Sequence, residues 1–167
     1  MKRILVTGAS GQVGPELVLA LRDSYGADNV IAAGHTRALP AEIRETGPHT
    51  RVDVTDYEEI ERVFKAFEID TLYHLGPLLS ALAEQKPRLA YEININGLWN
   101  VLEAASQSGL ERVIIPSSIA AFGPDAPRDM TPNDTIQRPN TLYGISKVFG
   151  ELMGNCYYQK LGLDVRG

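Results

Sequence analysis

The sequence predicts an α/β fold in which a doubly wound parallel sheet carries helices on both faces. Two observations support this. Short apolar runs rich in branched residues alternate with stretches of helical spacing along the chain, as expected for parallel strands joined by helical crossovers. The first run also passes through three glycines directly into a helix. In sheets of this kind the ligand lies at the carboxyl ends of the strands.

The expected elements follow one another in regular alternation. Apolar runs predict six strands, and apolar residues at three- and four-residue spacing predict the helices between them. Asp56 is a favourable N-cap for the second helix, and Gly109 is a favourable stop after the third. The segments 37–48 and 122–140 contain several prolines and are expected to be loops. The strands are expected at 4–6, 30–33, 50–54, 71–75, 112–116 and 163–166, and the helices at about 12–22, 56–67, 87–108 and 141–161.

Length and composition fit one domain of an ordinary globular protein. Sixteen basic and twenty-one acidic residues give a net charge of −5 without a basic block, which argues against nucleic acid or an anionic membrane as partner. No segment approaches the roughly 18 apolar residues of a membrane span. The single cysteine, Cys156, cannot form an internal disulfide, which favours a reducing compartment. We therefore expect a cytoplasmic protein.

The glycine turn after the first strand predicts a dinucleotide site. Its glycines, Gly8, Gly11 and Gly14, are spaced G-x-x-G-x-x-G. Such a turn must be tight, must let backbone approach a pyrophosphate and must let the helix pack on its strand. N–H groups at the helix start then face the anion. The residues expected to contact the cofactor here are Gly8, Ser10, Gly11, Gln12, Val13 and Gly14.

Tyr143 and Lys147 form the second informative motif. Four residues apart on a helix, their side chains share one face. A phenol with a pKa of about 10 is only about 0.1% ionised at pH 7, and a neighbouring ammonium favours the phenolate. Such a pair is suited to general acid/base chemistry on a hydroxyl. Ser117 and Ser118 follow the fifth strand, where a serine hydroxyl can bind the same substrate oxygen.

Other polar residues are expected to do less. His74 lies inside the fourth strand and is interpreted as a satisfied core group. No group of His, Cys, Asp and Glu has metal-ligand spacing in the sequence, so no metal site is expected.

The motifs Gly8-x-x-Gly11-x-x-Gly14, Ser117-Ser118-Ile119-Ala120-Ala121-Phe122-Gly123 and Tyr143-x-x-x-Lys147 stand in this order along the chain. Together with Asn94-Ile95-Asn96-Gly97 they resemble the extended short-chain dehydrogenases/reductases, the NAD-dependent epimerase/dehydratase superfamily with a Rossmann fold. More narrowly, Leu78-Leu79-Ser80-Ala81 and Ile115-Pro116-Ser117-Ser118-Ile119 are similar to the NAD-dependent L-threonine dehydrogenases of that group. The likeness covers essentially the whole chain.

This resemblance implies a reaction and a role for each matching residue. The reaction is oxidation of the β-hydroxyl of L-threonine to 2-amino-3-oxobutanoate, with hydride transfer to NAD. Tyr143 would be the base, Lys147 its electrostatic partner and ribose ligand, and Ser118 the residue that orients the hydroxyl. Ser80 would help to hold the substrate. Further cofactor contacts are implied for Asp53 and Val54 at the adenine, for Leu75, Gly76 and Pro77 at the ribose and pyrophosphate, and for Asn94 and Ser117.

The sequence departs from this pattern in three places. An NAD-preferring member should carry an acidic residue after the second strand, but Gly34 stands there, and His35 or Arg37 could pair with a 2′-phosphate. This loop can vary while NAD still binds, so we expect NAD as the cofactor, with NADP as the alternative. Pro77 has no N–H to offer the cofactor. Relatives continue well beyond position 167, so we expect the cofactor-binding part of a longer protein, inactive alone and without its substrate lobe.

Two questions stay open at this point. A nucleotide-sugar epimerase or dehydratase would use the same motifs, and a non-catalytic NAD(P)-binding module would share the fold. The resemblance also implies a homodimer through the helices at 87–108 and 141–161, with Trp99 and Tyr157 as anchors. Packing of these aromatic side chains within the chain is the alternative.

Overall fold

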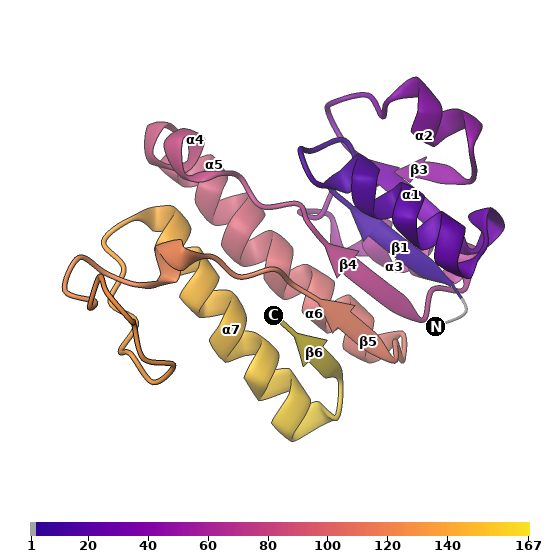
Figure 1. The fold of residues 1–167 in the computed structure, drawn as a ribbon. Coiled ribbons are helices and arrows are strands. Elements are labelled where there is room, and N and C mark those ends of the chain that lie inside the picture. The colour runs from indigo at the N-terminus through magenta and orange to yellow at the C-terminus, as the bar shows by residue number, and fades with distance from the viewer. Residues whose placement is uncertain (1–2) are drawn as a thin grey trace.

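The computed structural model describes residues 3–167, and its centre is a six-stranded parallel sheet (Figure 1). The strand order is β3-β2-β1-β4-β5-β6, the doubly wound order in which the crossover direction reverses between β1 and β4. The predicted fold class is thereby confirmed. The strands are β1 (Ile4–Thr7), β2 (Val30–Gly34), β3 (His49–Arg51), β4 (Thr71–His74), β5 (Arg112–Ile114) and β6 (Asp164–Arg166).

Helices connect the strands in the expected alternation. They are α1 (Gly14–Tyr25), η1 (Ala27–Asn29), α2 (Ala41–Glu45), α3 (Tyr57–Phe67), α4 (Ser80–Gln85), α5 (Pro87–Tyr91), η2 (Glu92–Gly97), α6 (Leu98–Gln107), η3 (Ile119–Ala121) and α7 (Leu142–Leu161). Four of them, η1, α2, α4 and η3, are short additions to the predicted helices. The helix expected at 87–108 consists of α5, the π-helical η2 and α6 in direct succession. Helix α2 lies in a segment expected to be a loop. Pro40 precedes its first turn, where a missing N–H costs nothing, and Ile43 anchors it in the core.

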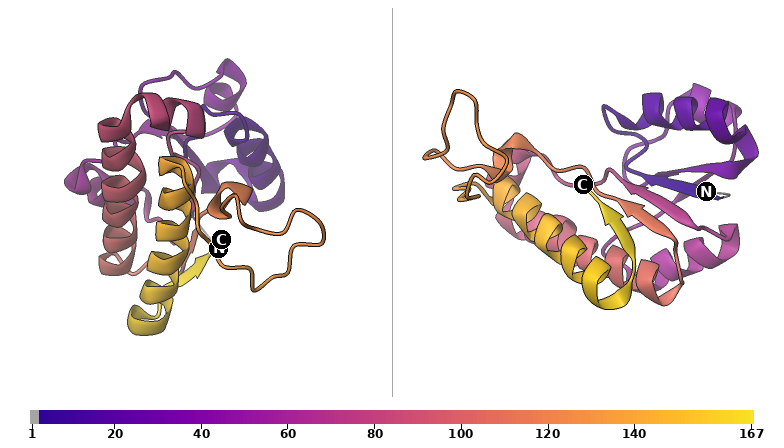
Figure 2. Two further views of the ribbon diagram at one scale, coloured as in Figure 1. Left: turned by 90° about the vertical axis from the view of Figure 1, so that its left-hand side faces the viewer. Right: turned by 60° about the horizontal axis from the view of Figure 1, so that its bottom comes forward.

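The two faces of the sheet are covered by different helices (Figure 2). Alternate strand residues point to opposite faces, so Ile4 and Val6 pack with α1 and α2, whereas Leu5 packs with α3 and α6. All three side chains are fully buried. This double coverage explains why β1 and β2 are continuously apolar rather than alternating.

Strand β3 is shifted relative to its prediction. The expected range was 50–54, but the strand covers His49–Arg51 and the chain turns at Asp53. The Asp53 carboxylate accepts hydrogen bonds from the backbone N–H and the hydroxyl of Thr55, at 2.9 and 2.7 Å. A short polar side chain that bonds the backbone two residues onward favours a turn over a strand.

Helix termini follow the capping rules. The Asp56 carboxylate accepts from the Glu59 N–H at 3.0 Å and begins α3, and the Thr141 hydroxyl accepts from the Gly144 N–H at 3.0 Å and begins α7. Gly109 has φ +69°, a left-handed conformation suited to the predicted helix stop. Among residues 3–167, no helix combines the length and apolar character required to cross a membrane.

Candidate active site

The carboxyl ends of the strands gather the residues that the sequence singled out. A cleft of about 450 Å³ opens beside β4, β5 and β6 against α7, and it contains His74, Asn94, Ser117 and Lys147 in its walls. Tyr143 lies one turn before Lys147 on the same helix. The glycine turn lies after β1, between β2 and β4 in the sheet order. The site therefore spans the point where the crossover direction reverses.

The glycine turn is built by close backbone approach. Gly8 has φ +70°, and a Cβ there would lie 2.6 Å from the carbonyl oxygen of Leu75 at the end of β4. A Cβ on Gly14 would lie 2.6 Å from the Gly8 carbonyl oxygen. Both positions therefore require glycine. The Ala9 N–H donates to the Ala33 carbonyl at 3.1 Å and ties the turn to β2.

The start of α1 suits an anion such as a pyrophosphate. No described side chain caps it, so its first N–H groups are left for a ligand. Val13, which precedes the helix, is 63% exposed, and Gly11 and Gln12 beside it are also exposed. An uncapped helix start flanked by glycines and an exposed apolar side chain fits the pyrophosphate and ribose of a dinucleotide.

His74 links this turn to the catalytic side of the cleft. Its Nδ1 lies 2.8 Å from the Thr7 hydroxyl, at the residue directly before Gly8. Burial, and then the charge of Lys147, lower the pKa of His74 to about 4. The imidazole is therefore neutral at physiological pH, and its hydrogen bond agrees with the interpretation of His74 as a satisfied core group.

Lys147 and Tyr143 form the pair that the motif predicted. The Lys147 Nζ lies 5.4 Å from the centre of the Tyr143 ring and donates to the Pro116 carbonyl at 2.6 Å. The side chain is buried, and this burial lowers the pKa of Lys147. An ammonium held over a phenol ring can stabilise a phenolate. The Pro116 carbonyl at the end of β5 fixes that ammonium in place.

The two serines after β5 have different partners. The Ser117 hydroxyl donates to the Glu151 carboxylate, which also accepts from the Gln137 side chain at 2.7 Å. The Ser118 hydroxyl accepts from the Ala120 N–H at 3.2 Å and so caps η3. No hydrogen bond within residues 3–167 uses its proton, whereas that of Ser117 is donated to Glu151. This difference supports Ser118 as the residue that orients a substrate oxygen.

Asn94 has a role that sequence reasoning did not identify. Its side-chain oxygen accepts from the Leu78 N–H at 2.7 Å, and its nitrogen donates to the Leu78 carbonyl at 3.0 Å. The π-helical turn η2 places this buried amide against the loop after β4. Asn94 therefore holds the segment that contains Leu75, Gly76 and Pro77, and its own cofactor contact stays a prediction.

Ser80, predicted to hold substrate, is the exposed first residue of α4. This helix is tied to the start of α7, because the Leu142 N–H donates to the Glu84 carboxylate at 2.7 Å. Glu151 and Glu84 are residues that sequence reasoning missed. Glu151 could have been noted from its position one turn after Lys147, whereas Glu84 carries no comparable signal.

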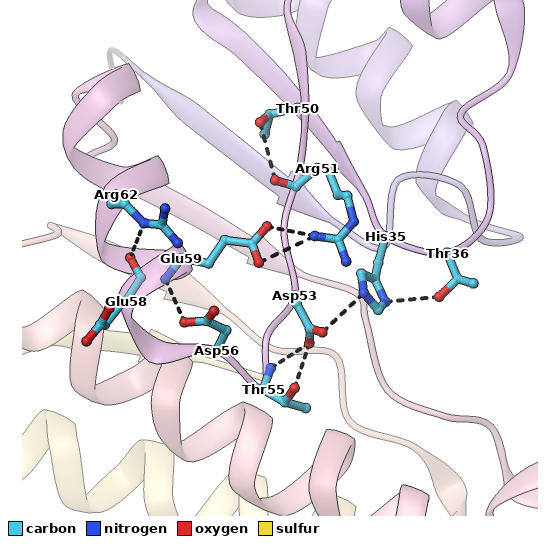
Figure 3. Close-up of polar contacts among 10 residues, drawn as sticks. All are labelled: His35, Thr36, Thr50, Arg51, Asp53, Thr55, Asp56, Glu58, Glu59 and Arg62. Atoms are coloured by element: carbon cyan, nitrogen blue, oxygen red, sulfur yellow. Dashed lines mark hydrogen bonds and ion pairs between the residues drawn. The ribbon is translucent and has the colours of Figure 1, made fainter.

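His35 and Asp53 meet at the ends of β2 and β3, although they stand 18 positions apart in the sequence (Figure 3). The His35 Nε2 lies 3.2 Å from the Asp53 carboxylate, and the His35 Nδ1 lies 3.0 Å from the Thr36 hydroxyl. Val54, the other residue predicted at the adenine, is partly buried against the core. The sheet thus brings Asp53, predicted at the adenine, into contact with His35, predicted at a 2′-phosphate.

Comparison with known proteins identifies the class to which this fold and site belong. Residues 4–166 match the NAD dependent epimerase/dehydratase family, and the chain belongs to this family. NAD is the family's cofactor, and the uncapped start of α1 fits it.

Within this family, the chain is more similar to some proteins than to others. The chain is 48% identical to an L-threonine dehydrogenase structure from Clostridium difficile, with a TM-score of 0.93 over 100% of this chain and 52% of that one. It is 46% identical to an uncharacterised epimerase/dehydratase of Staphylococcus epidermidis, over 99% of this chain and 52% of the relative. A UDP-glucose 4-epimerase from Thermotoga maritima shares 26% identity, with a TM-score of 0.88 over 98% of this chain and 53% of that one. The chain thus spans about half the length of the proteins it matches.

Proposed function

We propose that this chain is the dinucleotide-binding part of an NAD-dependent L-threonine 3-dehydrogenase. The observation that carries the proposal is the buried Lys147 ammonium over the Tyr143 ring, held by the Pro116 carbonyl in the segment after β5 that also contains Ser118. The high identity to an L-threonine dehydrogenase supports the choice of substrate. The proposed reaction is oxidation of the L-threonine β-hydroxyl to 2-amino-3-oxobutanoate.

The side chains can divide the chemistry as follows. Ser118 donates a hydrogen bond to the substrate hydroxyl oxygen and orients it. The Tyr143 phenolate takes the proton of that hydroxyl, while the Lys147 ammonium offsets the charge on the phenolate. The oxygen forms a carbonyl as the adjacent C–H bond breaks. Bound NAD supplies the acceptor for that hydrogen and its electron pair.

We infer that residues 1–167 form a domain within a longer protein whose remaining part completes the substrate site. The half-length match to the relatives supports this. The segment alone would then bind the cofactor but turn over little or no threonine, because substrate positioning contributes a large part of an enzyme's rate.

A nucleotide-sugar epimerase or dehydratase is the second candidate. It is supported by the family description and by the likeness to a UDP-glucose 4-epimerase. The lower identity to that protein favours the first candidate.

An assay of NAD reduction on the complete protein separates the two. L-threonine and a panel of UDP-sugars are each offered as substrate, with epimerised products measured in parallel. Threonine-dependent NADH formation is expected, and epimerase activity without threonine oxidation would overturn the proposal. Tyr143→Phe is expected to abolish turnover while NAD binding is retained, since only the proton acceptor is lost. Normal turnover by this variant would show that Tyr143 is not the base.

We also propose a homodimer through α5, α6 and α7, which lie side by side (Figure 2). These helices expose large apolar side chains that a partner could cover. Tyr157 is not one of them, because it is buried within the chain and its hydroxyl donates to the Glu103 carboxylate at 2.7 Å. Light scattering of the purified protein tests the assembly. The exposed side chains are Leu89, Tyr91, Trp99, Leu142, Ile145, Leu152, Tyr158 and Leu161.

A further inference from the structure

The end of β2 is where sheets of this kind distinguish NAD from NADP. A carboxylate there binds the 2′-hydroxyl of the adenosine ribose, whereas a nearby arginine accommodates a 2′-phosphate. In this chain β2 ends at Gly34. A Cβ on Gly34 would lie 3.3 Å from a Leu39 side-chain carbon and 3.3 Å from the Arg37 carbonyl oxygen. A side chain at this position would therefore require Leu39 and the Arg37 carbonyl to shift by a few tenths of an ångström, and the end of β2 itself supplies no carboxylate.

The nearest carboxylate, that of Asp53, is already engaged. One of its oxygens accepts both hydrogen bonds from Thr55, and the other pairs with His35 (Figure 3). Burial acts to raise the pKa of Asp53, but the Thr55 hydrogen bonds and the charges of His35 and Arg51 outweigh it and lower that pKa. Asp53 is thus an ionised group whose charge is offset by its neighbours. A ribose hydroxyl would have to share its oxygens with Thr55 and His35.

The two arginines at the carboxyl ends of β2 and β3 differ in whether a carboxylate pairs with them. Arg51 pairs with the Glu59 carboxylate at 3.1 Å. Arg37 is exposed, and within residues 3–167 no carboxylate lies at ion-pair distance from it. His35, two positions earlier in the same loop, is also exposed. The loop after β2 therefore presents a guanidinium with no ion-pair partner among residues 3–167, two positions from an imidazole whose nitrogens contact Asp53 and the Thr36 hydroxyl.

We propose that His35 and Arg37 form a subsite for the 2′-phosphate of an adenosine dinucleotide, so that the chain binds NADP as well as NAD. A guanidinium offers paired donors that match phosphate oxygens. The His35 Nδ1 can donate a further hydrogen bond by exchanging the Thr36 hydroxyl for a phosphate oxygen, while Nε2 keeps its contact with Asp53. This inference rests on the proposed dinucleotide function and adds which residues select the coenzyme.

Two small probes isolate the subsite, because 5′-AMP and adenosine 2′,5′-bisphosphate differ only in the 2′-phosphate. Their dissociation constants are measured by calorimetry on the wild type, Arg37→Gln, His35→Gln and Lys65→Gln. Lys65 is the matched control, since it is an exposed cation in the last turn of α3, at the amino ends of the strands. NAD and NADP are titrated in parallel.

The wild type is expected to bind the bisphosphate about tenfold more tightly than 5′-AMP, as one charge-assisted contact would give. Arg37→Gln should abolish this advantage without changing 5′-AMP binding, which also shows that the variant is folded. His35→Gln should reduce the advantage, and Lys65→Gln should preserve it. Equal binding of the two probes by the wild type would overturn the subsite, and so would a preference for the bisphosphate that survives Arg37→Gln. In either case, binding of NAD would leave the proposed dinucleotide function intact. If NAD also fails to bind, both are overturned.

Discussion

The contact between Gly8 and the end of β4 can be tested by adding a single methyl group. Gly8→Ala introduces a Cβ at φ +70°, 2.6 Å from the Leu75 carbonyl oxygen. Gly109 has nearly the same φ, +69°, but nothing lies within 4 Å of a Cβ there. Gly109→Ala is therefore a control that introduces the same backbone strain without the collision.

The loss of stability expected for Gly8→Ala has two parts, the backbone strain and the collision with Leu75. Left-handed backbone costs an alanine about 1–2 kcal/mol at either position. At Gly8 the Leu75 carbonyl must also move by about 0.8 Å to reach the 3.4 Å at which ordinary contact begins. Overpacking of this kind costs about 1–3 kcal/mol more. For a domain of this size, that excess corresponds to a melting temperature about 2–12 °C lower than that of Gly109→Ala.

Thermal unfolding followed by circular dichroism measures the difference in melting temperature between Gly8→Ala and Gly109→Ala. Titration with NAD measures the effect of each substitution on cofactor binding. Gly8→Ala should also weaken NAD binding, because Leu75 and Gly76 are expected to line the cofactor site. Gly109→Ala should bind NAD as the wild type does. Equal melting temperatures and equal NAD affinities for the two variants would refute the close approach of β1 and β4 at this turn.

Two further predictions concern His74 and Trp99. The folded chain keeps His74 neutral down to a pH of about 4, whereas the unfolded chain protonates it near its ordinary pKa of 6.5. The free energy of unfolding should therefore fall by about 3 kcal/mol as the pH drops from 6.5 to about 4. Urea unfolding from pH 7 to pH 4 should show a shallower fall for His74→Gln, and an unchanged slope would contradict the buried neutral imidazole. Trp99→Glu should convert the proposed dimer to a monomer by light scattering while Trp99→Phe keeps it, and an unchanged mass for Trp99→Glu would place the interface elsewhere.

Much of the fold followed from local patterns. Apolar runs predicted the inner strands β1, β2 and β4 most sharply, because strands buried on both faces cannot be polar. The edge strands β3 and β6 are more polar and more exposed, and β3 lies earlier in the chain than predicted. The glycine spacing located the turn whose backbone contacts the structure then displayed. The short helices α2 and α4 were not predicted, since a single helical turn carries too few apolar positions to show periodicity. Helix α2 is stabilised by the burial of Ile43, a tertiary contact.

The site was predicted residue by residue but not in its connections. Spacing alone paired Tyr143 with Lys147, because both stand on one helix face. The hydrogen bonds of Asn94 to Leu78 and of Ser117 to Glu151 join residues 16 and 34 positions apart. The first also depends on the π-helical turn η2, which shifts the helical register locally. Contacts between residues this far apart have no local sequence pattern, so they can be identified only from the folded structure.

We propose that the uncapped start of α1 and the cleft beside Lys147 form one NAD site. Titration of the 15N-labelled chain with NAD, followed by amide chemical shifts, tests whether they do. The largest shifts are expected at Gly11, Gln12 and Val13, with further shifts at Gly76, after β4, and at Ser117, after β5. Shifts confined to the amino ends of the strands, or none in a folded chain, would contradict a shared site.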